Sequence, residues 1–144
     1  MRLPALTLRL RLGAISYGLL VFLWLSPEDN HVWPVAVLGA GLSLMVGGLA
    51  VISRFGGRVI PRRWLLLSAA LAGLVVGAGA AVAAAGLMLV KTALHSHIYP
   101  DYPLPLILAM LERAPAWGLA GLLVGGALAL LWSARQPHTE QAAL

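Results

Sequence analysis

The chain has 144 residues, of which 60% are hydrophobic and only 10% are charged, and its net charge is +5. A water-soluble domain usually carries about 25% charged residues, and a chain this short cannot bury so much apolar surface in one core. This composition therefore excludes an ordinary soluble domain and favours a membrane protein. The absence of cysteine excludes disulfides, thiolate metal sites and cysteine nucleophiles.

Four apolar segments approach the length of about 20 residues, roughly 17–25, that a helix needs to cross the hydrocarbon core of a membrane. We predict spans at residues 10–26, 32–52, 64–90 and 116–132. The first has a basic start like a signal peptide, but no small-x-small cleavage site precedes Pro27, so we expect it to be retained. No segment shows the alternating pattern of a membrane barrel strand.

Residues Leu104 to Pro115 are too few to span a membrane and have two interpretations. Pro103 and Pro105 suit a helix start, whereas Pro115 breaks or kinks the chain before the last span. The segment is either a short interfacial or re-entrant helix, or the first part of a fourth helix kinked at Pro115. The predicted fold is all-α: one integral membrane domain, residues 1–144, forming a four-helix bundle with or without this short fifth helix.

The charges predict which way the chain crosses the membrane. Four spans place eight arginines and one acid, Glu140, on one side, for a net charge of +7, and the other side sums to −2. Basic loops stay in the cytoplasm, so we expect the loop 53–63, the tail 133–144 and both termini there. The loop 91–115, with His95 to Tyr102, then faces the exterior, the periplasm or a lumen.

The arginines of the loop 53–63 have a simple interpretation as topology signals that contact lipid headgroups. A nucleic-acid partner is not expected, because the arginines are divided among short loops with no aromatic stacking surface between them. The arginines concerned are Arg54, Arg58, Arg62 and Arg63.

Small residues form a stripe along the third predicted span, at every fourth position, and a GxxxG spacing occurs in the last span. In lipid, small residues let helix backbones approach closely. Two interpretations stay open: packing of the four helices within one chain, and docking onto other subunits. The residues of this predicted packing surface are Ala69, Gly73, Gly77, Ala81, Ala85, Gly121 and Gly125.

The outer side collects residues that could ligate a divalent metal: His95, His97, Asp101 and His31. His95 and His97 are two positions apart, so both lie on one face only where the chain is extended. A third ligand would come from Asp101 or His31. The alternatives are a pH sensor, because histidine titrates near neutral pH, and an ordinary polar helix end.

No Asp, Glu, Lys, Arg or His lies within the apolar stretches 12–25, 35–52, 65–90 and 118–131, which argues against a proton-coupled transporter acting alone. No serine has a base and an acid at a known triad spacing, so we do not expect an enzyme. We expect a non-catalytic accessory subunit or assembly factor of a larger membrane complex. Its partners would be lipid and other membrane subunits or a second copy. The alternative is a metal-binding or metal-sensing membrane protein, and an apolar ligand between spans would leave no motif.

One set of substitutions separates these two functions. As a subunit, the chain should lose assembly when Gly73→Leu and Gly77→Leu are introduced, because leucine blocks close helix approach. As a metal-binding protein, it should lose a bound metal with His95→Ala and His97→Ala. Native mass spectrometry of protein extracted gently from its membrane measures both assembly and bound metal. If neither set of substitutions changes either quantity, both functions are contradicted.

Overall fold

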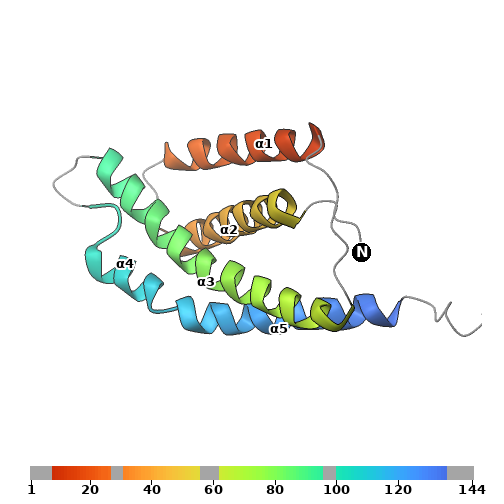
Figure 1. Ribbon diagram of the computed structural model, residues 1–144. Helices are drawn as coiled ribbons and strands as arrows, with labels where there is room; N and C mark the ends of the chain where they lie inside the picture. Colours follow the sequence, from red (N-terminus) through yellow and green to blue (C-terminus); the bar gives the residue numbers. More distant parts are fainter. Residues whose placement is uncertain (1–7, 27–30, 56–61, 96–99, 136–144) are drawn as a thin grey trace, which may run out of the picture.

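The computed structural model describes residues 8–26, 31–55, 62–95 and 100–135, and these form five α-helices and no strand (Figure 1). The helices are α1 (Leu8–Leu25), α2 (Val32–Phe55), α3 (Arg62–Leu94), α4 (Leu104–Leu111) and α5 (Ala114–Ala134). The predicted all-α class is confirmed.

Three stretches of helix are long and apolar enough to cross a membrane: Val32–Arg54, Trp64–Leu94 and Leu104–Ala134. They correspond to the second, third and last predicted spans. The first predicted span is not confirmed, because the apolar part of α1 covers only Arg11–Leu25. A four-span bundle is therefore shown only as three candidate spans and one shorter apolar helix.

The helices α4 and α5 form one nearly continuous unit with a change of direction between them (Figure 1). Glu112 and Arg113 keep right-handed helical dihedrals between the two. The Glu112 N–H donates to the Leu108 carbonyl at 2.9 Å and the Arg113 N–H to the Met110 carbonyl at 3.2 Å, the tighter bonding of a helix end. Pro115 has no N–H to continue the ladder. This geometry is that of a helix kinked before Pro115.

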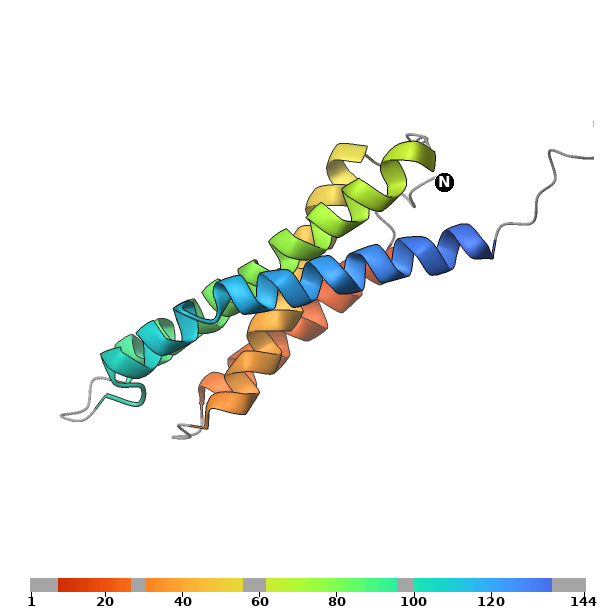
Figure 2. The same ribbon diagram turned by 90° about the horizontal axis from the view of Figure 1, so that it is seen from below.

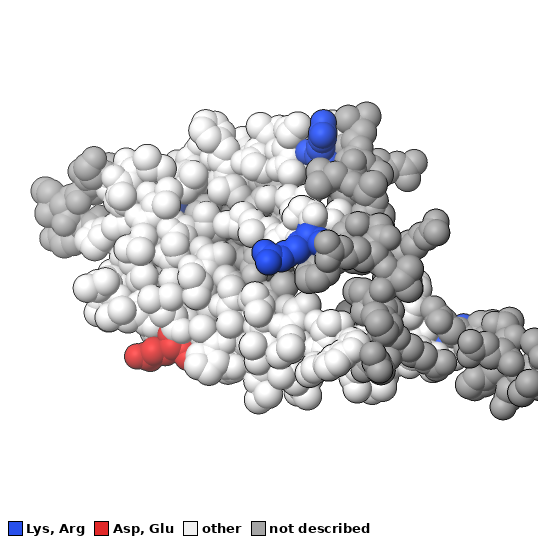
Figure 3. Space-filling view, viewed as in Figure 1, with Lys and Arg blue, Asp and Glu red and all other residues white. Residues whose placement is uncertain are grey.

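The helix α3 is the centre of the fold, because it packs against α2, α4 and α5, whereas α1 contacts α2. Figures 1 and 2 show α2 and α5 on different sides of α3. The C-terminal ends of α2 and α5 lie at the same end of the molecule as the N-terminal ends of α1 and α3. We call this the basic end, because Arg11, Arg54 and Arg135 belong to the helix ends that lie there. The acidic side chains visible in Figure 3 lie towards the opposite end.

Glycines bring α3 and α5 into direct backbone contact. A Cβ atom added to Gly73 would overlap the Gly121 carbonyl, one added to Gly77 would overlap the Trp117 carbonyl, and one added to Gly125 would overlap the Ala69 carbonyl. Lipid supplies no hydrophobic force between helices, so packing at short range has to hold this pair together. These members of the predicted stripe therefore lie between helices of the same chain.

The remaining stripe residues, Ala81 and Ala85, are buried further along α3. The contact between α2 and α3 is also close: a Cβ at Gly39 would lie 2.6 Å from the Ala84 nitrogen. The Ser43 hydroxyl donates to the Val76 carbonyl at 2.7 Å, which adds a polar contact inside the apolar part of the fold. Small residues on two faces of α3 thus serve two neighbouring helices.

We predict that Gly121→Ala destabilises the protein by about 1–3 kcal/mol, because the new methyl group overpacks the contact between α3 and α5. The matched control is Gly86→Ala in α3, where nothing lies within 4 Å of an added Cβ. There alanine should be neutral or stabilising, since glycine costs about 1 kcal/mol relative to alanine inside a helix. Thermal unfolding in detergent checks both variants, and equal stability of Gly121→Ala and Gly86→Ala would contradict the packing described.

Candidate functional site

A buried core and a set of polar contacts lie together at the end opposite the basic end, which we call the polar end. The core there contains Met88 of α3, Ile107 and Met110 of α4, Val35 of α2 and Tyr102, which is 1% exposed. Elements distant in the sequence therefore meet around the segment just before α4.

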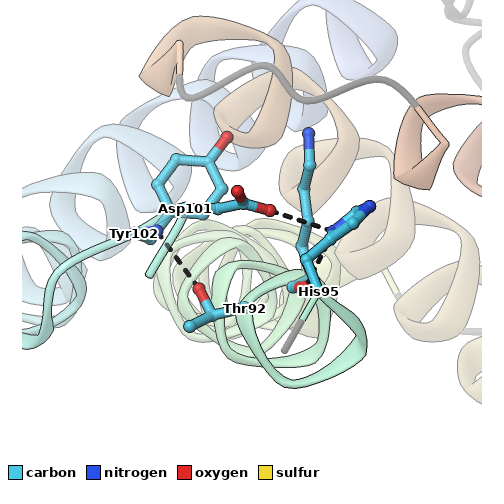
Figure 4. A network of polar contacts seen from close by, with 5 residues as sticks. Thr92, His95, Asp101 and Tyr102 are labelled. Atoms are coloured by element: carbon cyan, nitrogen blue, oxygen red, sulfur yellow. Dashed lines mark hydrogen bonds and ion pairs between the residues drawn. The ribbon is translucent and has the colours of Figure 1, made fainter. Parts of the chain in front are cut away.

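Tyr102 holds this segment to two helices (Figure 4). Its backbone N–H donates to Thr92 Oγ1 at 3.2 Å, which attaches it to the last turns of α3. Its hydroxyl donates to the carbonyl of His31 at 3.1 Å, directly before α2 begins. A buried tyrosine normally finds such a partner for its hydroxyl. One side chain thus fixes the start of α2 relative to the end of α3.

His95 and Asp101 are in direct contact at the polar end, with His95 Nδ1 2.9 Å from Asp101 Oδ2 (Figure 4). The same nitrogen lies 3.2 Å from the Lys91 carbonyl. A carboxylate and a carbonyl are both acceptors, so Nδ1 carries the proton. In a neutral ring Nε2 then carries the lone pair, and a carboxylate that orients a histidine in this way is common behind metal-ligating histidines.

Lys91 lies in α3, one turn before His95. It is fully buried, and its Nζ is 4.5 Å from the centre of the Trp24 ring. Lysine is almost never fully buried without a compensating interaction, and an ammonium over an indole face is one such interaction. The contact joins α3 to α1. Lys91 belongs to the predicted loop 91–115, and its burial was not predicted from the sequence. The available signal was its position one turn before His95, at the end of a long apolar helix.

The predicted metal ligands are brought together only in part. His95 and Asp101 meet, whereas His31 contributes its backbone carbonyl to Tyr102 and is itself exposed. His97 lies outside the described residues. Within the parts of the chain that the structure describes, no group of three His, Asp or Glu residues is placed to hold a metal ion. The metal site stays a prediction that depends on residues outside the described ranges.

The predicted headgroup-contacting arginines belong to the basic end. Arg54 is exposed at the end of α2, and Arg62 and Arg63 begin α3. Arg58 lies outside the described residues. Arg135, directly after α5, is exposed as well.

An apolar groove of about 630 Å³ runs between α2, α3 and α5. Glycine, alanine, valine and leucine line it together with Trp117, so no lining side chain is ionisable. The glycines that bring α3 and α5 together form part of the floor. Sequence reasoning identified these small residues but did not predict the open groove beside them.

The chain matches no protein-family model, no curated protein and no solved structure. Its function is therefore inferred from its own residues and geometry.

We predict that Tyr102→Phe lowers the free energy of unfolding by about 1 kcal/mol, because it removes the hydrogen bond to the His31 carbonyl and keeps the ring. Thr92→Val should cost more, about 1–3 kcal/mol, because it leaves the Tyr102 N–H without its acceptor. The control is Ser53→Ala, whose hydroxyl bonds only within its own helix, to Ala50. Denaturant titration in mixed micelles measures the three variants. Wild-type stability of both polar-end variants would show that Tyr102 does not hold the segment in place.

Proposed function

We propose that the chain is a non-catalytic interaction subunit or assembly factor of a larger membrane complex, and that it contacts its partner through α1. The support comes from how α1 is held and from what it leaves open. The partner is another membrane-embedded protein, whose helix packs beside α1.

The helix α1 contacts the rest of the chain through Tyr17 and through Val21 and Trp24, which pack against the buried core. The Tyr17 hydroxyl donates to the Leu38 carbonyl of α2. The Tyr17 ring also packs on Gly41 of α2, because a Cβ atom added to Gly41 would lie only 2.7 Å from Tyr17 Cε2. Near the other end, Trp24 covers Lys91. Most of the other large apolar side chains of α1 are 54–69% exposed: Leu12, Ile15, Leu19, Leu20, Phe22 and Leu23.

The observation that carries the proposal is the surroundings of Gly18. Nothing lies within 4 Å of a Cβ added to Gly18, and the same is true of Gly13. A glycine inside a helix costs about 1 kcal/mol relative to alanine. Elsewhere in this chain, between α3 and α5, that cost is offset by close packing. Gly18 has no such contact within the chain, and Ala14 lies one turn before it, the spacing at which small residues admit another helix.

This arrangement changes which substitutions test assembly. Gly73 and Gly77 pack against α5, so a leucine at either position disrupts the chain itself and reports on folding. A leucine at Gly18 meets open space within the chain and removes only a contact made from outside. Gly18→Leu therefore distinguishes a partner from the fold, which Gly73→Leu does not.

We predict that Gly18→Leu removes partner polypeptides from the protein without lowering its own thermal stability. The measurement is native mass spectrometry and cross-linking of the tagged full chain, extracted gently from its own membrane. The matched control is Gly86→Leu, which also meets open space but lies on α3. It should retain the partner.

Recovery of the wild-type chain alone, without other polypeptides, would contradict the proposed function. Loss of the partner with Gly86→Leu but not with Gly18→Leu would contradict the use of α1. A bound divalent metal that disappears with His95→Ala would instead favour the metal-binding alternative.

A further inference from the structure

The groove between α2, α3 and α5 has a length, a lining and a charge at one end that together identify a ligand. We propose that it binds an acyl chain of an anionic phospholipid, whose phosphate lies at the basic end beside Arg54. This inference does not depend on the proposed docking of a partner at α1, because the two surfaces share no lining residue.

The groove is as long as one leaflet of a membrane is deep. On α2 it extends from Ala40 to Val51, and on α5 from Trp117 to Leu128. Eleven residues of helix rise by about 16 Å. The hydrocarbon core of a bilayer is about 30 Å thick, so one leaflet supplies about half of that depth. A single acyl chain lying along the groove therefore fits the dimension that the helices impose.

The lining suits a flexible hydrocarbon chain. All lining side chains are apolar except for the indole nitrogen of Trp117, and many are glycine or alanine. Gly48 faces the groove with nothing within 4 Å of an added Cβ, so the space is open on the α2 side. A volume of about 630 Å³ is within the range of small-molecule sites, which is about 300–1,000 Å³.

The charge distribution selects an anionic headgroup and places it at one end. Val51 lies one turn before Arg54 on α2, and on the other wall α5 leads from Leu128 to Arg135. Among the described residues, the acids Asp101 and Glu112 both belong to the opposite half of the molecule. In Figure 3 the acidic side chains lie towards the end of the molecule opposite the basic end. An anionic phosphate at this end meets arginine and no described carboxylate.

The shape of the molecule leaves this space accessible from the membrane. The helices α2 and α5 both pack against α3, and their C-terminal ends lie apart in both ribbon views (Figures 1 and 2). The groove lies between these two helices, with Val51 and Leu128 at the end nearest the basic end, where a lipid of the adjacent leaflet can enter with its headgroup at the surface.

The test measures lipid retention by the full chain after detergent delipidation and addition of one defined lipid. The probes are a phosphatidylglycerol and a phosphatidylcholine with identical chains, and native mass spectrometry counts bound lipid. The wild type should bind phosphatidylglycerol in preference. Arg54→Gln should weaken that preference by about fivefold, as expected for one arginine near an anionic headgroup. Arg113→Gln, an exposed arginine at the other end, is the charge-matched control and should change nothing.

The site proposed for the acyl chain of the lipid is tested with Gly48→Leu in α2 and Ala120→Leu in α5, which fill the groove from two helices. Each should reduce binding of both lipids at least about tenfold, whereas Gly86→Leu, outside the groove, should not. Two groove variants are used so that one that fails to fold does not decide the result. Wild-type lipid binding by a folded groove variant would overturn the site. An equal loss of the preference for phosphatidylglycerol with Arg54→Gln and Arg113→Gln would mean general charge attraction and would overturn the position of the headgroup beside Arg54. A dimer or bound polypeptide that the groove variants release would make the groove a protein interface and overturn the lipid assignment.

Discussion

Backbone contact between α3 and α5 is the constraint on which the other helices depend. Gly73, Gly77, Gly121 and Gly125 allow the two backbones to touch, and larger side chains at these positions would overlap carbonyl groups of the facing helix. Because lipid does not drive apolar helices together, this contact substitutes for the hydrophobic core of a soluble protein. Once α5 occupies this face of α3, α2 crosses α3 at Gly39 and Ala84, and α1 reaches the bundle through α2. The groove is the space left beside α3 between these two packed neighbours.

The polar end is held together by contacts of side chains around the segment before α4. Loop backbone has no regular helical bonding, so side chains must fix its path. Tyr102 and Thr92 fix the segment before α4, His95 and Asp101 hold the end of α3, and Lys91 meets α1. The contacts of Tyr102 with His31 and of Lys91 with Trp24 join elements that are distant in the sequence. The basic end shows the opposite arrangement, with arginines exposed at helix ends.

The sequence predicted helix type and most helix positions, because long apolar runs are strong signals of membrane helices. It predicted a first span at residues 10–26, which is not confirmed, because the apolar stretch described in α1 is Arg11–Leu25. It left the segment before Pro115 open, and the structure gives it the dihedrals of a kinked helix. The close contact of Gly73 with Gly121 was predictable as small-residue packing, but the partner of each glycine was not, because spacing shows a face and not what covers it. The burial of Lys91 and the proximity of Asp101 to His95 depend on the path of a loop, which residue type and spacing do not determine.

The contact of Lys91 with Trp24 has a consequence for how the chain is made. Trp24 is synthesised well before Lys91, since the two belong to the first and third helices. The indole ring that covers the ammonium group is therefore already part of the chain when α3 is completed. A helix at the edge of the finished molecule thus supplies the ring that covers its single lysine, and the order of the helices along the chain places that ring before the charge that it covers.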